Sequence, residues 1–138
     1  MSESTRIVDR ATDNARLARS GYEAFARGDF AGSTATFDPG VVWHAQRLGQ
    51  LGGDHVGLGA VMAFFGRTME LTRGTFRIEV LDVLGSDERA AVVVRSTAQR
   101  DGRTLDSRQV HLFRIEDGNV LEIWQYVDDA EAVSAFWA

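Results

Sequence analysis

The sequence predicts an α+β fold in which helices come first and an antiparallel sheet follows. Apolar residues recur at helical spacing in the first half of the chain, whereas β-branched and aromatic residues dominate the segments after Gly74. The connections between these later segments are too short for parallel crossovers, so neighbouring strands are expected to run antiparallel. A chain of 138 residues is typical of one domain, which we assign to residues 13–138.

Two helices are predicted near the N-terminus. The first is expected to begin at Asp13, whose side chain can cap it, and to end at Gly28. Asp29 can cap a shorter helix over residues 30–37. Residues 1–12 are polar and are expected to form a flexible N-terminus.

A third helix is predicted over residues 60–71, where apolar side chains again repeat at helical spacing. The segment before it starts with a turn at residues 38–40 and a short strand at Val41–Ala45. Residues 46–59 hold five glycines and are expected to form a loop. No Gly-Lys-Ser/Thr sequence follows these glycines, which argues against a phosphate-binding loop.

The rest of the chain predicts a four-stranded meander and a short final helix. The expected strands are Thr75–Leu84, Arg89–Arg100, Arg103–Ile115 and Asn119–Val127. Asp-Gly pairs at 101–102 and 117–118 separate three of them, and Asp-Gly between apolar runs is a strong hairpin signal. Asp128 or Asp129 can cap the final helix, which is expected to end at Phe136-Trp137.

The last hairpin has a predicted register. We expect a three-residue loop at residues 116–118, because it gathers the apolar side chains of both strands on one face. That register pairs Phe113 with Leu121, His111 with Ile123, and Gln109 with Gln125. The inner face would then be apolar and become polar near Gln109 and Gln125, as in a typical small-molecule pocket.

The opposite face of this hairpin is also apolar, since it carries Val110, Leu112, Trp124 and Tyr126. A sheet that is apolar on both faces needs a cover on each side. The helices can cover one face, and a second copy of the chain is the simplest cover for the other. We therefore expect a homodimer formed through the outer face of the sheet.

Composition excludes several function classes. Fifteen Lys and Arg against twenty Asp and Glu give a net charge of −5, which argues against nucleic-acid partners. There are no cysteines, so disulfides and thiolate catalysis are excluded. The first ten residues lack the apolar core of a signal peptide, and no apolar run approaches the length of a membrane span. We expect a cytoplasmic protein with no membrane partner, no cofactor and no metal, since its three histidines lack metal-ligand spacing.

Three segments carry a resemblance to a known family. They are YEAFARGDF at 22–30, VVWH at 41–44 and DGNVLEIW at 117–124. Over residues 13–137 the chain resembles the nuclear transport factor 2-like superfamily, and more narrowly the SnoaL-like polyketide cyclases and ketosteroid isomerase-like proteins. The resemblance implies a cone, in which a curved sheet wraps around helices and a pocket lies at the open end.

The resemblance also implies site positions. In SnoaL-like cyclases a carboxylate on the last strand takes a proton and a histidine on the preceding strand supports it. These positions correspond to Gln125 and His111, and glutamine does not titrate, so it cannot act as a general base. In the isomerases the base lies near the first strand, where this chain offers Trp43 and His44 and no acid.

The candidate catalytic residues are therefore His44, His111 and Gln125. The candidate substrate-binding residues are Tyr22, Phe25, Phe65, Met69 and Gln109. Each also fits an ordinary role, because a buried histidine can be satisfied by a neighbour, two amides can pair, and aromatic residues at helical spacing commonly form a core.

These residues favour an enzyme that binds an apolar, polyketide-like substrate and promotes intramolecular cyclisation or isomerisation. Without a carboxylate base, it would hold a reactive conformer and stabilise developing charge by hydrogen bonds. A pericyclic ring closure suits such a site better than an aldol reaction does. The alternatives are a carrier that binds a small molecule without turnover, and an interaction domain whose dimer face is its function.

Overall fold

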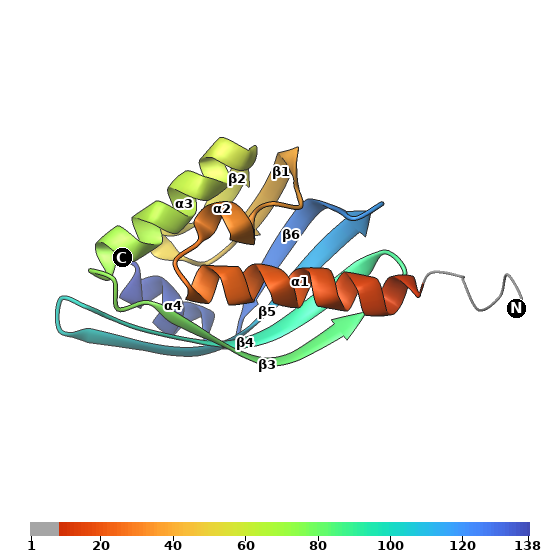
Figure 1. Ribbon diagram of the computed structural model, residues 1–138. Coiled ribbons are helices and arrows are strands. Elements are labelled where there is room, and N and C mark those ends of the chain that lie inside the picture. The colour runs from red at the N-terminus through yellow and green to blue at the C-terminus, as the bar shows by residue number, and fades with distance from the viewer. Residues whose placement is uncertain (1–8) are drawn as a thin grey trace, which may run out of the picture.

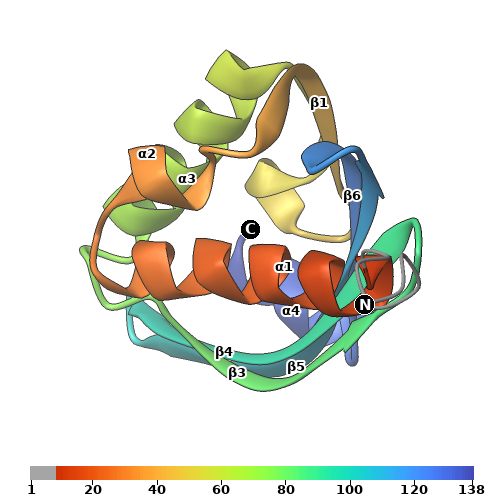
Figure 2. The same ribbon diagram turned by 45° about the vertical axis from the view of Figure 1, so that its right-hand side comes forward.

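The computed structural model describes residues 9–138, in which helices pack on one side of a curved six-stranded sheet (Figures 1 and 2). The helices are α1 (Arg10–Ala26), α2 (Phe30–Ser33), α3 (Leu58–Leu71) and α4 (Ala130–Phe136). The strands are β1 (Phe37–Ala45), β2 (Gly53–Val56), β3 (Arg77–Gly85), β4 (Arg89–Arg100), β5 (Arg103–Glu116) and β6 (Asn119–Val127). Their order in the sheet is β2-β1-β6-β5-β4-β3. The expected α+β fold with a curved sheet around N-terminal helices is confirmed.

Helix α1 begins three residues before the expected cap at Asp13. Asp9 caps it instead, since its carboxylate accepts hydrogen bonds from Thr12 N at 3.1 Å and Thr12 Oγ1 at 2.7 Å. Residues 10–12, which were expected to be flexible, are therefore helical. Residues 1–8 of that expected flexible segment lie outside the described residues.

The start of α1 is fixed against the turn between β3 and β4. Asn14 is buried, and its Nδ2 donates to the Ser86 carbonyl at 2.9 Å. Gly85 allows the close approach, because a Cβ at this position would collide with the Ala11 carbonyl. The sheet curves around α1 from this point (Figure 2).

The segment after α1 contains less helix and more strand than expected. Helix α2 ends at Ser33, and β1 starts at Phe37, four residues before the predicted strand. The turn signal at residues 38–40 lies inside β1, where the pairing with β6 is irregular. Asp38 Oδ2 accepts from Gly40 N at 2.8 Å there, so the turn chemistry forms a local irregularity in a longer strand.

The glycine-rich segment 46–59 is not only a loop. It contains a short 3₁₀ helix at Gly49–Leu51 and strand β2, which pairs antiparallel with β1 and places His55 opposite Trp43. Helix α3 starts within this segment at Leu58, two residues earlier than expected, and packs against β1 and β2.

Strands β3 to β6 form the predicted antiparallel meander. The prediction of an antiparallel sheet is wrong at one place, because β1 runs parallel to β6. A parallel neighbour needs a long connection, and here the helix α3 and strands β2 to β5 lie between the two strands in sequence. This pairing brings Trp43 beside Ile123.

The predicted register of the last hairpin is wrong. The turn has two residues, Asp117 and Gly118, both with positive φ, and one extra residue, Leu121, bulges from β6. Beyond the bulge His111 lies opposite Gln125 and not opposite Ile123. The observed register differs from the predicted one by two residues, so every side chain beyond the bulge keeps its predicted face.

The C-terminal helix is α4, which Asp129 caps by accepting from Ala132 N at 3.0 Å. Of the two candidate caps, Asp129 therefore has this role. No helix within residues 9–138 combines the length and apolarity needed to cross a membrane.

Candidate functional site

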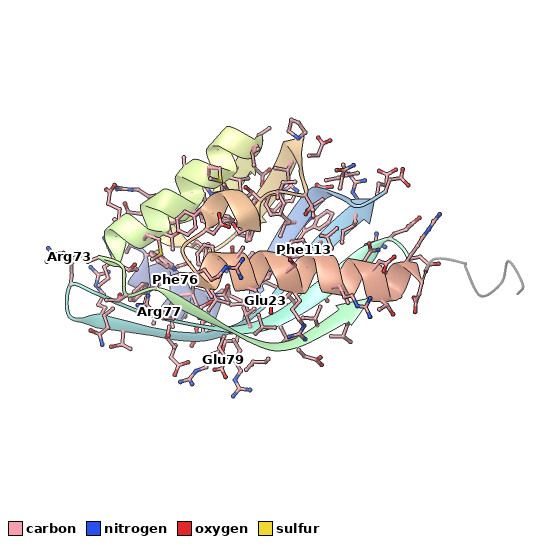
Figure 3. All side chains as sticks on the ribbon, viewed as in Figure 1. Glu23, Arg73, Phe76, Arg77, Glu79 and Phe113 are labelled. Atoms are coloured by element: carbon pink, nitrogen blue, oxygen red, sulfur yellow. The ribbon has the colours of Figure 1, made fainter. Side chains whose placement is uncertain are left out.

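A cavity of about 60 Å³ lies between the sheet and helices α1, α2 and α3. Aromatic rings form much of its wall, and they come from Tyr22, Phe25, Phe37, Trp43, Phe64, Phe65, Phe76 and Phe113. Figure 3 labels two of the lining residues, Phe113 on β5 and Phe76 just before β3. Among residues 9–138, no Asp, Glu, Lys or Arg lines the cavity.

The cavity is small for the substrate that the sequence suggested. Pockets for drug-sized ligands measure about 300–1,000 Å³, and an apolar cavity of about 150 Å³ takes benzene. A hollow of about 60 Å³ therefore excludes a multi-ring polyketide unless side chains move. Even a single ring needs a larger hollow than this, so wall side chains must move to admit one.

Tyr22 and His111 form the polar centre of this wall. Tyr22 projects from α1 and His111 from β5, and the Tyr22 hydroxyl lies 2.5 Å from His111 Nδ1. Burial lowers the pKa of His111 to about 3, and its side chain is only 2% exposed. Burial also raises the pKa of Tyr22 well above its usual value. Both groups are consequently neutral near pH 7.

Two glutamines and a tryptophan continue the network on the inner face of the sheet. His111 Nε2 lies 3.1 Å from Gln109 Oε1, which also accepts from Gln125 Nε2 at 2.8 Å. Trp43 Nε1 donates to Gln125 Oε1 at 2.9 Å. The two side-chain amides pair with each other, which is the structural role that the sequence analysis left open for them. Gln125 nevertheless lines the cavity, whereas Gln109 supports it from behind.

The network ends at Asp128, just after β6. Gln109 Nε2 donates to Ser107 Oγ at 3.4 Å, and Ser107 Oγ donates to Asp128 Oδ1 at 2.9 Å. Burial alone would raise the pKa of Asp128, but hydrogen bonds from Arg108 N and Ser107 Oγ outweigh it and lower the pKa. Asp128 is therefore a carboxylate near pH 7, and it does not cap α4.

His44 does not lie at the cavity. The side chain of Trp43 points inward, so the next residue on β1 points to the outer face of the sheet. There His44 stacks on Trp124, and its ring nitrogens lie 2.8 Å from Asp54 Oδ1 and 2.6 Å from Glu122 Oε2. The expectation that His44 lies at the mouth of the cavity is thus wrong, because strand alternation places it on the other face, and its catalytic role stays a prediction.

The outer cluster of His44, Asp54 and Glu122 is an ion-pair group. Burial lowers the pKa of His44, but the hydrogen bonds to Glu122 and Asp54 outweigh this effect and raise it. Within residues 9–138, no group of histidines and carboxylates is arranged to hold a metal ion.

The predicted substrate-binding residues divide into two groups. Tyr22, Phe25 and Phe65 line the cavity, whereas Met69 does not. Phe64, Phe65 and Thr68 form the inward face of α3, and Met69 is rotated away from it by one helical step. Their role in binding a substrate stays a prediction.

The sequence analysis missed three residues of the hydrogen-bond network, Trp43, Ser107 and Asp128. Trp43 had a readable signal, because Val41, Trp43 and Ala45 alternate as the buried side of β1. Ser107 and Asp128 had none, since their contacts depend on how the ends of β5 and β6 meet.

The curved sheet, the helices on its concave side and the cavity between them define a nuclear transport factor 2-like α+β cone. The family model described as "SnoaL-like domain" matches residues 18–123, and the chain belongs to this family.

Several proteins are similar to this chain in sequence or in structure. An uncharacterized protein of Mycobacterium tuberculosis is 34% identical over 130 residues, covering 92% of this chain and 99% of its own. Bal32a, from a soil-derived mobile gene cassette, is 37% identical with a TM-score of 0.90, covering 94% of this chain and all (100%) of its own. A protein of unknown function with a cystatin-like fold from Xanthomonas campestris is 32% identical with a TM-score of 0.84, covering 91% of this chain and 98% of its own.

Proposed function

We propose that this protein is a SnoaL-like enzyme that binds a small apolar organic molecule and promotes its cyclisation or isomerisation. The observation that supports it is a charge-free aromatic cavity with a half-buried Tyr22 and a buried His111, both neutral, hydrogen-bonded in its wall. Its volume limits the substrate to a short chain or a single ring, which narrows the polyketide-like substrate expected from the sequence.

The chemistry that such a cavity favours moves little net charge. A base that must become charged is at a disadvantage here, because burial already opposes an imidazolium at His111. Gln125, at the position where the cyclases carry a carboxylate, can only donate or accept hydrogen bonds. Rate acceleration would therefore come from holding a reactive conformer between the aromatic rings and from hydrogen bonds to developing partial charge.

The test is to incubate the protein with linear and single-ring polyketide-like compounds and to follow products by chromatography with mass spectrometry. We expect a cyclised or isomerised product whose rate falls in Tyr22→Phe and in His111→Gln. Tyr126→Phe is the matched control, since it removes the same hydroxyl from the outer face, where Tyr126 is 54% exposed. Equal rates in all of these proteins would refute the proposal.

A second experiment examines the mechanism. Gln125→Glu introduces the carboxylate that the cyclases have at this position. If it raised the rate and brought a new pH dependence, catalysis by shape and hydrogen bonds alone would be wrong. Deuterium uptake from heavy water into the product distinguishes a proton-moving route from a pericyclic one, which takes up none.

The second candidate is a carrier that binds the same kind of molecule without turnover. The small cavity and the low basicity of His111 favour it. Ligand binding to the unaltered protein, with no product after long incubation, would select this function over the enzyme.

A further inference from the structure

The hydrogen bonds around the cavity have a direction, which two groups at opposite ends of the network set independently. The indole N–H of Trp43 can only donate, so the Gln125 atom that it contacts is Oε1. The amide nitrogen of Gln125 then points to Gln109, whose nearest atom is the acceptor Oε1. Gln109 is only 4% exposed and has little freedom to turn.

The other end leads to the same orientation of Gln109. The Asp128 carboxylate can only accept hydrogen bonds, so Ser107 Oγ donates its single hydrogen to Asp128 Oδ1. Ser107 can then only accept from Gln109, which requires the amide nitrogen of Gln109 on that side. Both ends therefore place Gln109 Oε1 toward His111.

This orientation fixes the tautomer of His111. Gln109 Oε1 needs a donor, so the ring proton lies on Nε2, and the neutral ring keeps a lone pair on Nδ1. The atom facing Nδ1 is the Tyr22 oxygen, and the Tyr22 hydroxyl must donate its hydrogen to it. Donors and acceptors in such a chain polarise one another, so the Tyr22 oxygen becomes a stronger acceptor.

Other hydroxyl groups of the wall also present acceptors, and not donors, to the cavity. The hydroxyls of Ser33 and Thr68 donate to the carbonyls of Phe30 and Phe64, each at 2.8 Å. Their hydrogens, like that of Tyr22, are used within the protein, which leaves their oxygen lone pairs for a ligand. Thr36 and the second amide hydrogen of Gln125 remain as donors. At Tyr22 itself, the wall offers an acceptor only.

We propose that the cavity takes a small ring compound carrying a hydroxyl group, an alcohol, phenol or enol, which donates its hydrogen to the Tyr22 oxygen. A ketone of the same size leaves that oxygen without a partner. The inference rests on the proposed function in that it takes the same cavity as the ligand site, and it names the class of molecule that the site selects.

Cyclohexanol and cyclohexanone are the probes, because they share a ring and differ in whether the oxygen carries a hydrogen. We expect cyclohexanol to bind about tenfold more tightly than cyclohexanone, the effect of one buried hydrogen bond. Relative to the unaltered protein, this ratio should fall about tenfold in Tyr22→Phe and stay unchanged in Tyr126→Phe. Since the same two compounds are compared in each protein, their different costs of leaving water cancel.

Three results would overturn the inference: a ketone that binds as well as the alcohol, a preference that persists in Tyr22→Phe, or no binding of either compound at millimolar concentration. A ligand-free measurement gives a further check if Tyr22→Phe does not fold. The imidazole nitrogen shifts of His111 by NMR should show a proton on Nε2 and none on Nδ1, and the opposite tautomer contradicts the proposal.

The two proposals fail separately. Product formation without a preference for the hydroxyl compound would remove this inference and leave the enzyme intact. A clear preference for the hydroxyl compound with no product from any compound would leave this inference intact and remove the proposed enzyme activity.

Discussion

Lowering the pH from about 7 to about 4.5 is expected to destabilise the protein through His111. In the unfolded chain this histidine takes up a proton near its ordinary pKa of about 6.5. In the folded protein burial holds its pKa at about 3, so the folded state stays unprotonated over the interval between these values. Because the unfolded state binds more protons there, stability falls as the pH falls.

The magnitude follows from the two pKa values. Each unit of pH between them costs about 1.4 kcal/mol, and the loss between about pH 7 and about pH 4.5 comes to roughly 2.5 kcal/mol. The side chain is only 2% exposed, so solvent screens little of this effect. A loss of this size is a large part of the free energy of unfolding of a typical domain.

The assay is urea denaturation of the unaltered protein and of His111→Gln at several pH values. The variant keeps polar atoms at this place but does not titrate, and all other groups are common to both proteins. The difference in their unfolding free energies should shift by roughly 2.5 kcal/mol in favour of the variant toward about pH 4.5. Two parallel stability curves, or an NMR titration of His111 near its ordinary pKa, would contradict the burial argument.

Three further outcomes are expected from other parts of the molecule. Ser96 Oγ is buried and has no hydrogen-bond partner within residues 9–138, so Ser96→Ala should leave the unfolding free energy unchanged or raise it. Ser107→Ala should lower the unfolding free energy by about 1–2 kcal/mol, because it breaks the hydrogen bond to Asp128. A loss in Ser96→Ala as large as that in Ser107→Ala, measured by urea denaturation, would be inconsistent with this assignment. The ion pairs that raise the pKa of His44 stabilise the fold below about pH 6.5, and this stabilisation is lost as the pH rises through the pKa of the folded state. Thermal melts should therefore show that His44→Gln destabilises the protein more near pH 6 than near pH 9. A destabilisation that does not depend on pH would exclude the ion pairs as its cause. We propose that the apolar outer face around Tyr126 pairs with a second copy of the chain. Light scattering should show a dimer that Tyr126→Asp converts to a monomer. A monomer in both proteins would rule out this interface.

The helices and the meander could be predicted because their signals are local. The apolar repeat of α3 and the Asp-Gly turns lie within a few residues of the structure that they specify. The parallel contact between β1 and β6 joins segments far apart in the sequence, and no local pattern marks it. Asp9 shows the same limit at smaller scale, since both it and Asp13 are sound caps and tertiary contacts of Asn14 favour the longer helix.

The site was partly predictable for a related reason. The error at Leu121 amounted to two residues, and a strand repeats its faces every two residues, so His111 and Gln125 were placed inward with the wrong partners. His44 follows the inward-facing Trp43 on β1, and one step along a strand reverses the face. The volume of the cavity and the contacts of Asp128 depend on side-chain packing, which the order of residues does not reveal.

Asp128 lies outside the cavity, yet the direction of every hydrogen bond from Ser107 to Tyr22 agrees with its charge. Asp128 at one end and Trp43 at the other thus agree on which way the phenol proton points at the centre of the molecule. A tag, truncation or fusion that disturbs the chain after β6 would remove one of the two groups that set this direction and leave Trp43 as the other. Work on this protein should therefore keep the C-terminal ten or so residues unmodified, although none of them lines the cavity among the described residues.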